Sequence, residues 1–216
     1  MKFRWETEFK ETEIGEIPEI PRDWEIIELK KFITNIIKGK TPKKIDGEIP
    51  YLSAKYLRGE DDPEGYYDVS AGIYVENGEI IILWDGSNSG EVFKAKRGLL
   101  ASTMCKLEIN DTKINKDYLY IVLKSQEEEI KSAKSGTDDR HVDKDYFLEI
   151  PVPFPPLSEQ SRIAQVLSYF DDLIENKKKQ NEILEKTAMA IFKNWFIDFE
   201  PFKDQEFVYN EELGKE

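Results

Sequence analysis

Few residues in this sequence could do covalent chemistry. His141 is the only histidine and Cys105 the only cysteine, so a base-activated serine or cysteine nucleophile has little support. Cys105 follows Met104 in an apolar stretch, which favours a buried thiol. No dinucleotide-type glycine loop follows a predicted strand. We therefore expect no catalytic residue in this chain.

Two stretches imitate metal sites in part. The turn at residues 85–90 (DGSNSG) begins like a calcium loop, but the twelfth position is Lys96, where a bidentate glutamate is needed. Asp117 with residues 129–131 imitates a nuclease cluster, yet residues 127–131 are typical of a solvated helix face. We expect no metal site and no cofactor bound by this chain.

The charge distribution favours a binding role. The net charge of -13 argues against nucleic acid, but residues 30–58 carry eight basic and only two acidic side chains. Phosphates respond to charge within a Debye length of about 10 Å, so one basic face can bind DNA on an acidic protein. The candidate phosphate contacts are Lys38, Lys40, Lys43, Lys44, Lys55 and Arg58.

Polar and aromatic residues near this basic stretch could read base edges. Each of them is as readily explained as a solvated surface residue, so the prediction rests on the group. The candidates are Thr41, Tyr51, Ser53, Tyr56, Ser87, Asn88, Ser89, Thr137, Arg140 and His141.

The pattern of expected strands and helices predicts an α+β domain over residues 1–155, which would carry these residues. Residues 78–107 alternate short apolar runs with turns, which indicates a hairpin or meander. Residues 117–132 have helical spacing, and residues 148–154 with two prolines predict a last, edge strand. The sheet is therefore expected to be mixed or antiparallel.

A long helix is predicted after this domain, from Ser158 as N-cap to Phe199, within a segment of residues 156–200 that an acidic tail, residues 201–216, follows. Its apolar residues recur at alternating steps of 4 and 3, the heptad spacing of a coiled coil. The seam turns polar at Lys177 and Asn181, which either fixes register or opens the seam to water. The expected interface positions are Ile163, Leu167, Phe170, Ile174, Asn181, Leu184, Ala188, Ile191 and Trp195.

Targeting signals are absent from the sequence. There is no run of 18 apolar residues, and the N-terminus lacks the apolar region of a signal peptide. A lone cysteine excludes a disulfide framework. We expect a soluble cytoplasmic protein without membrane association.

Three segments carry a resemblance to a known family. They read EIGEIPEIPRDWEIIELKKFITNIIKGKTP near the start, SGTDDRHVDKDYFLEIPVPFPPLSEQSRIAQVLSYFDDLIENKKKQNEIL at the junction with the helix, and AIFKNWFIDFEPF at its end. The chain resembles the DNA-specificity subunit of type I restriction-modification systems. The junction, a proline-rich strand followed by residues 157–160 (LSEQ), is the most specific of the three.

The resemblance implies a non-catalytic subunit that directs methyltransferase subunits, and with them a restriction or translocase subunit, to a bipartite DNA site. S-adenosylmethionine, ATP and magnesium would belong to those partners. A full subunit of the family resembles two copies of a target-recognition domain with its helix, so this chain resembles a half-length, single-repeat form. We expect it to form a homodimer through the helix. The alternative is a coiled-coil adaptor whose domain binds protein.

Overall fold

The apolar strand β8 (Ile80–Leu83) lies at the centre of the fold. The computed structural model describes residues 8–132 and 141–204. Side chains alternate between the two faces of a strand. Ile80 and Ile82 belong to one core cluster, and Ile81 and Leu83 to another. All four are buried, which explains why β8 reads as a continuous apolar run.

The sheet that contains β8 is antiparallel, with the strand order β4-β11-β8-β9. On one of its faces, buried side chains of α2 such as Leu119 and Leu123 join Ile80 and Ile82 in the first cluster. On the other, Leu52 and Leu100 of the second sheet join Ile81 and Leu83. The other strands of this sheet and the helix packed on it are β4 (Ile33–Lys38), β9 (Val92–Lys94), β11 (Met104–Ile109) and α2 (Lys116–Ser125).

The second sheet has the order β6-β5-β10-β7 and is mixed, because β10 pairs parallel with β5 and antiparallel with β7. The predicted α+β class with a mixed or antiparallel sheet is therefore confirmed. The elements of this layer are β5 (Asp46–Leu52), α1 (Ala54–Arg58), β6 (Tyr66–Tyr67), η2 (Val69–Ala71), β7 (Tyr74–Val75) and β10 (Gly98–Leu100).

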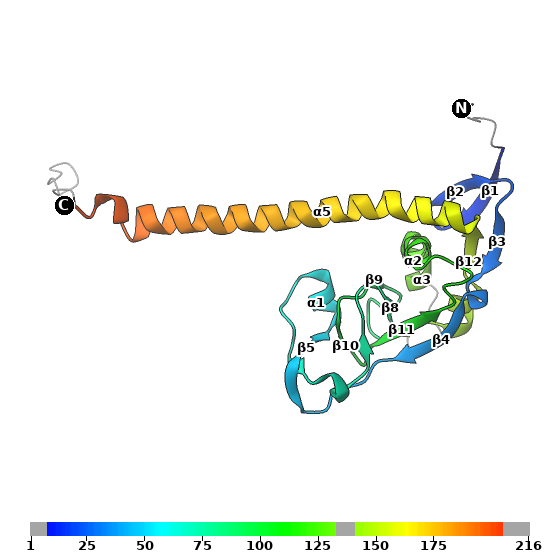
Figure 1. Ribbon diagram of the computed structural model, residues 1–216, viewed down its shortest axis with the longest axis horizontal. Coiled ribbons are helices and arrows are strands. Elements are labelled where there is room, and N and C mark those ends of the chain that lie inside the picture. Colours follow the sequence, from blue (N-terminus) through cyan, green and yellow to red (C-terminus); the bar gives the residue numbers. More distant parts are fainter. Residues whose placement is uncertain (1–7, 133–140, 205–216) are drawn as a thin grey trace. The chain divides into compact units, whose positions relative to one another are not determined.

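Two short antiparallel pairs complete the strands (Figure 1). A hairpin at the start of the described chain consists of β1 and β2, and β3 pairs with β12 from the end of the domain. The predicted strand at 148–154 is shorter, because residues up to Glu149 belong to helix α4. These elements are β1 (Phe9–Ile14), β2 (Ile17–Pro21), β3 (Glu25–Glu28), η1 (Leu29–Lys31), α4 (Lys144–Glu149) and β12 (Pro151–Phe154).

The helix predicted over 117–132 is two helices, α2 and α3 (Glu127–Ser132), which meet at Gln126. The buried side chain of Gln126 donates from Nε2 to the carbonyl oxygen of Pro151, at 3.0 Å. The break therefore ties the helical layer to β12.

The long helix α5 runs from Leu157 to Phe192, then continues as a π-helical turn, Lys193–Ile197, and a 3-10 turn, Glu200–Phe202. Ser158 is not its N-cap, because the helix has already begun at Leu157. Gln160 anchors the start: its Oε1 accepts from the Asn115 amide at 2.8 Å, and its Nε2 donates to the Pro155 carbonyl at 2.9 Å. Gln160 is fully buried.

The chain divides into two compact units, 1–166 and 167–216. The first unit thus includes the start of α5, whereas the boundary predicted from the sequence lies at residue 155. Ala164 is buried in the first unit's core, and Ile163 packs against the same cluster. Of the helices in the described part, none combines the length and the apolar character that crossing a bilayer requires.

Candidate nucleic-acid interface

The loop between β4 and β5, residues 39–45, is fixed by its backbone. The Gly39 amide donates to the Met104 carbonyl at 2.8 Å, and the Lys43 amide to the Ala71 carbonyl at 2.9 Å. A Cβ at Gly39 would lie 2.0 Å from the Ala101 carbonyl oxygen, so only glycine fits there. This loop is therefore held in one conformation on the second sheet.

The side chains of this loop point away from the core. Lys40, Thr41, Lys43 and Lys44 are all exposed. Among the residues that the structure describes, the three lysines make no ion pair with any carboxylate. Their charges are thus available to an external anion.

At the end of β4, a charged cluster joins three segments that are distant in sequence. Asp85 is 2.7 Å from Lys38 Nζ through Oδ2, and 2.6 Å from His141 Nδ1 through Oδ1. Only 18% of the Asp85 side chain is exposed, against 56% for Lys38 and 59% for His141. The hydrogen bond to Asp85 raises the pKa of Lys38.

The backbone fixes this cluster as well. The amide of Asp85 donates to the Thr103 carbonyl at 3.0 Å, and the amide of Val142 donates to the Trp84 carbonyl at 3.0 Å. His141 directs its Nδ1 at the carboxylate, so its Nε2, which has no partner among residues 8–132 and 141–204, could meet a base edge as an acceptor when the imidazole is neutral. Asp85 therefore sets the orientation of both neighbours.

The turn from Asp85 to Gly90 divides its polar side chains between two environments. Ser87 and Asn88 are exposed. Ser89 is only 1% exposed, and its Oγ has no hydrogen-bond partner within the described ranges. Gly90, at φ 98°, packs against the backbone of Lys131. Ser89 thus belongs to the interior of the turn and not to the surface that a duplex would meet.

The two cations of α1 are engaged within the domain. Lys55 lies 3.4 Å from Asp61, and Arg58 holds Glu91 in a bidentate pair with Nε–Oε distances of 3.0 and 3.1 Å. Hydrogen bonds with Glu91 raise the pKa of Arg58. Asp61, which closely follows α1, and Glu91, just before β9, therefore neutralise the charge that α1 carries.

Three candidate base readers on the same stretch have structural contacts. The Tyr51 hydroxyl accepts from the Ser102 amide at 3.1 Å, and Ser53 Oγ caps α1 by accepting from the Tyr56 amide at 3.3 Å. The Tyr56 ring lies 5.2 Å below Lys96 Nζ. These contacts explain the three side chains without any ligand.

The structure thus groups one part of the predicted set and separates another. Lys38, the 85–90 turn and His141 meet at the end of β4, and the loop that carries Lys40, Thr41, Lys43 and Lys44 continues from there along the chain. We call this group the basic edge. Thr137 and Arg140 lie outside the described residues. Sequence reasoning missed Asp85 as the organising residue, because nothing in its turn signals a partner 56 positions away.

Across residues 8–132 and 141–204, no group of three or more His, Cys, Asp or Glu side chains is placed to hold a metal ion. Cys105 is buried, and burial raises the pKa of its thiol to about 12. It is therefore a protonated, inert thiol at neutral pH.

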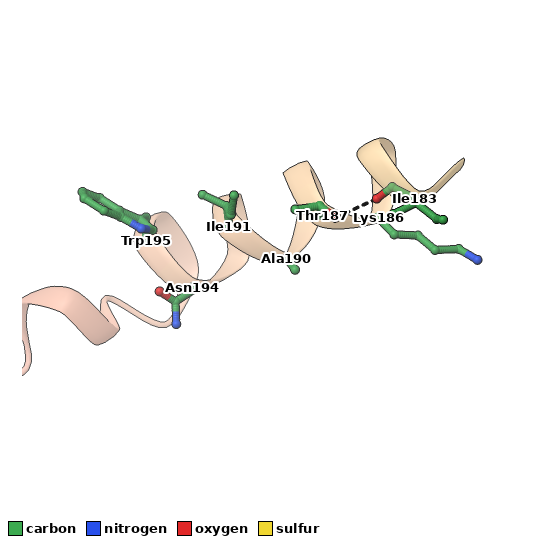
Figure 2. A pocket seen from close by; sticks show the side chains of 7 residues that line it. All are labelled: Ile183, Lys186, Thr187, Ala190, Ile191, Asn194 and Trp195. Atoms are coloured by element: carbon green, nitrogen blue, oxygen red, sulfur yellow. Dashed lines mark hydrogen bonds between the residues drawn. The ribbon is translucent and has the colours of Figure 1, made fainter. Parts of the chain in front are cut away.

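The predicted coiled-coil seam is open along the second unit. Leu167, Phe170, Ile174, Leu184, Ile191 and Trp195 are 38–65% exposed. Figure 2 shows Ile191 and Trp195 projecting from the same side of the helix, beside a shallow groove that Thr187 and Asn194 also line. Ile163 differs from the prediction, because it packs on its own domain. The open seam therefore begins at Leu167.

A family model described as the type I restriction modification DNA specificity domain matches residues 21–186. The chain belongs to this family. Within it, the chain is 42% identical to the type I restriction enzyme MjaIX specificity subunit of Methanocaldococcus jannaschii, over 100% of this chain and 53% of that protein. The MjaVIII specificity subunit of the same organism is 41% identical, over 91% of this chain and 46% of that protein.

The fold of this specificity-family chain agrees with solved structures. A type I restriction-modification S subunit from M. genitalium superposes with a TM-score of 0.65 at 24% identity, over 81% of this chain and 46% of that one. The HsdS subunit from Thermoanaerobacter tengcongensis superposes with a TM-score of 0.53 at 20% identity, over 85% of this chain and 48% of that one. The chain spans about half the length of the curated relatives it matches.

Proposed function

We propose that this chain is a non-catalytic subunit that recognises a DNA half-site and brings methyltransferase subunits to it. The observation that carries the proposal is the basic edge: Lys40, Lys43 and Lys44 are exposed and unpaired among the described residues, on the loop that follows Lys38 of the Asp85 cluster. Loop lysines supply phosphate contacts, and Ser87, Asn88, Thr41 and His141 supply groups for base edges.

Two identical copies would form the reading unit. The apolar seam of α5 is exposed from Leu167 to Trp195, and a coiled coil with a second copy would cover it. A two-fold dimer of identical reading domains recognises an inverted repeat. S-adenosylmethionine, ATP and magnesium would then be bound by the methyltransferase and restriction partners. A role on genomic DNA requires the cytoplasmic compartment.

A charge-reversal experiment tests the DNA-binding role. The triple variant Lys40→Glu, Lys43→Glu and Lys44→Glu is titrated with a pool of random-sequence duplexes at several salt concentrations. We expect affinity at low salt to fall at least tenfold, and the slope of log affinity against log salt to fall by about one for each lysine lost.

A matched control separates local charge from net charge. Lys116→Glu, Arg162→Glu and Lys186→Glu change the net charge equally at positions outside the basic edge, and should leave the affinity within about twofold of the original. Equal losses in both triples, or no loss in the first, would contradict the assignment. An adaptor that binds protein would show no loss in either.

A further inference from the structure

Two aliphatic residues are exposed beside the lysines of the 39–45 loop. Ile45 is 41% exposed and Val69 is 49% exposed. Ile45 directly follows Lys43 and Lys44, and Val69 is the first residue of η2. In the part of the chain that the structure describes, neither belongs to a core cluster or packs against one. Packing within the domain therefore does not explain why these two surface positions are apolar.

Backbone hydrogen bonds fix the position of both residues. The Asp68 amide donates to the Ile45 carbonyl at 2.9 Å, so Val69 directly follows the residue that is bonded to Ile45. The Ile45 amide donates to the Lys43 carbonyl at 2.8 Å, which closes a tight three-residue turn. Asp68 Oδ1 accepts from the Ser70 amide at 2.9 Å and so caps η2. The aliphatic pair is thus held on a backbone that is already ordered.

The side chains of this pair suit a shallow contact. Both are β-branched, so each has few rotamers and loses little freedom when a partner covers it. At 41% and 49% exposure, Ile45 and Val69 are each about half covered by their own domain. A wedge between stacked base pairs must enter the stack with its side chain, as in proteins that kink DNA from the minor groove. Half-covered side chains instead touch the surface of what lies above them.

The charges around the pair indicate what that surface is. Lys40, Lys43 and Lys44 are exposed and make no ion pair within the described ranges. An apolar pair beside unpaired cations suits a partner that carries apolar groups close to phosphates. In the major groove of DNA, the C5-methyl group of thymine is such a group, and the minor groove presents none.

We propose that Ile45 and Val69 contact thymine C5-methyl groups in the major groove and so make thymine a preferred base of the half-site. This inference rests on the DNA-binding role of the proposed function and deepens it. The lysines bind phosphates whatever the sequence, whereas a methyl contact distinguishes thymine from the other bases. The aliphatic pair therefore contributes to specificity, and the lysines beside it contribute to affinity.

Removing single methyl groups from the DNA tests the contact with the full chain. The duplex that the chain selects from a random pool is remade with deoxyuridine in place of one thymine at a time, which deletes a methyl group and keeps base pairing. We expect affinity to fall about fourfold at one or two positions of each half-site, the effect of exposing one buried methyl group. Fluorescence anisotropy measures the change. A selected site without thymine, or one in which no replacement lowers affinity, would overturn the proposal.

Protein variants assign the methyl contact to the aliphatic pair. In the double variant Ile45→Ala and Val69→Ala, deoxyuridine at the sensitive positions should cost less than about 1.5-fold, because the contact is already lost. Ile45→Val keeps a branched side chain and should retain most of the sensitivity. Ile26→Ala is the matched control, since Ile26 is 47% exposed on β3 in another sheet, and it should retain all of it. Undiminished methyl sensitivity in the double variant would overturn the assignment.

The lysine variant of the proposed function separates the two claims. If Lys40→Glu, Lys43→Glu and Lys44→Glu together weaken DNA binding but the original chain shows no methyl sensitivity, the thymine contact is overturned and the DNA-binding role stands. If the original chain binds no duplex at all, the DNA-binding role and the thymine contact are overturned together.

Discussion

At the residue scale, Asp85 decides how the basic edge is presented. Its carboxylate holds Lys38 and His141 at 2.7 and 2.6 Å, while its own side chain is only 18% exposed. A carboxylate in a DNA-binding surface repels phosphates, so its presence needs a compensating role. We propose that orienting Lys38 and His141 is that role, since restrained side chains lose less entropy on binding.

This role predicts a change opposite to that expected from charge alone. Asp85→Ala removes a negative charge, yet it should lower affinity for the specific site by about tenfold or more because Lys38 and His141 lose their orientation. Asp46→Ala removes an equal charge from an exposed side chain directly after the loop of residues 39–45. It should leave specific affinity unchanged or raise it, as measured by fluorescence anisotropy. Stronger specific binding by Asp85→Ala would contradict the positioning role.

Glu127 is a second residue whose role is visible only in the structure. The sequence places it on a solvated helix face, but its side chain is 12% exposed. Its Oε2 accepts from the Val92 amide at 3.0 Å, and Lys124 and Lys131 contact it as well. Burial opposes ionisation, yet these hydrogen bonds hold the pKa of Glu127 below its usual value.

Glu127→Gln should therefore lower the free energy of unfolding by about 1–3 kcal/mol at neutral pH. Because the folded-state pKa is depressed, this contribution is present above the ordinary glutamate pKa and is lost as the pH falls through the lower folded value. The difference between the two proteins, measured by urea unfolding, should shrink on acidification. Glu128→Gln, at an 86% exposed side chain, is the control and should have little effect. A constant difference down to acidic pH would contradict this account.

At the scale of elements, sequence patterns predicted those strands and helices that local interactions determine. The apolar run of β8 and the heptad spacing of α5 are strong local signals, and both elements form as expected. The break at Gln126 and the pairing of β3 with β12 could not be predicted, because both depend on residues from the other end of the domain. Gln160 shows the same limit. The sequence indicates that it lies near the start of the helix, but not that its side chain accepts a hydrogen bond from the Asn115 amide.

The candidate site was predictable to a similar extent. A basic stretch in an acidic chain predicts which segment could meet phosphate, and the structure shows that the loop lysines of this stretch are exposed. The sequence does not show which cations of this stretch form ion pairs within the domain. Arg58 pairs with Glu91, and Lys55 pairs with Asp61. Both pairings depend on how the chain folds in three dimensions.

Salt should act on the two proposed interfaces of the chain with opposite signs. Two copies that pair antiparallel about Lys179 would place Lys178 next to its own copy and Asp171 next to Glu185 at the rim of the contact, so like charges would meet there. Sodium chloride screens this repulsion and should strengthen dimerisation, as measured by analytical ultracentrifugation. DNA binding should weaken over the same range because phosphate contacts release counterions. Dimerisation that weakens with salt would contradict the antiparallel register.

At the scale of the whole molecule, the chain is about half the length of its curated relatives and has one recognition domain with one long helix. Its seam is exposed from Leu167 to Trp195, and a second copy of the chain would cover it. Two copies would then present two identical basic edges related by a two-fold axis. The combination predicts an inverted repeat with a fixed spacer as the recognised DNA.

Selection of duplexes from a random pool by the purified chain tests this account most directly. We predict enrichment of two inverted copies of one short sequence, separated by a spacer of constant length. Enrichment of a single half-site without an inverted partner, or of no sequence at all, would contradict it.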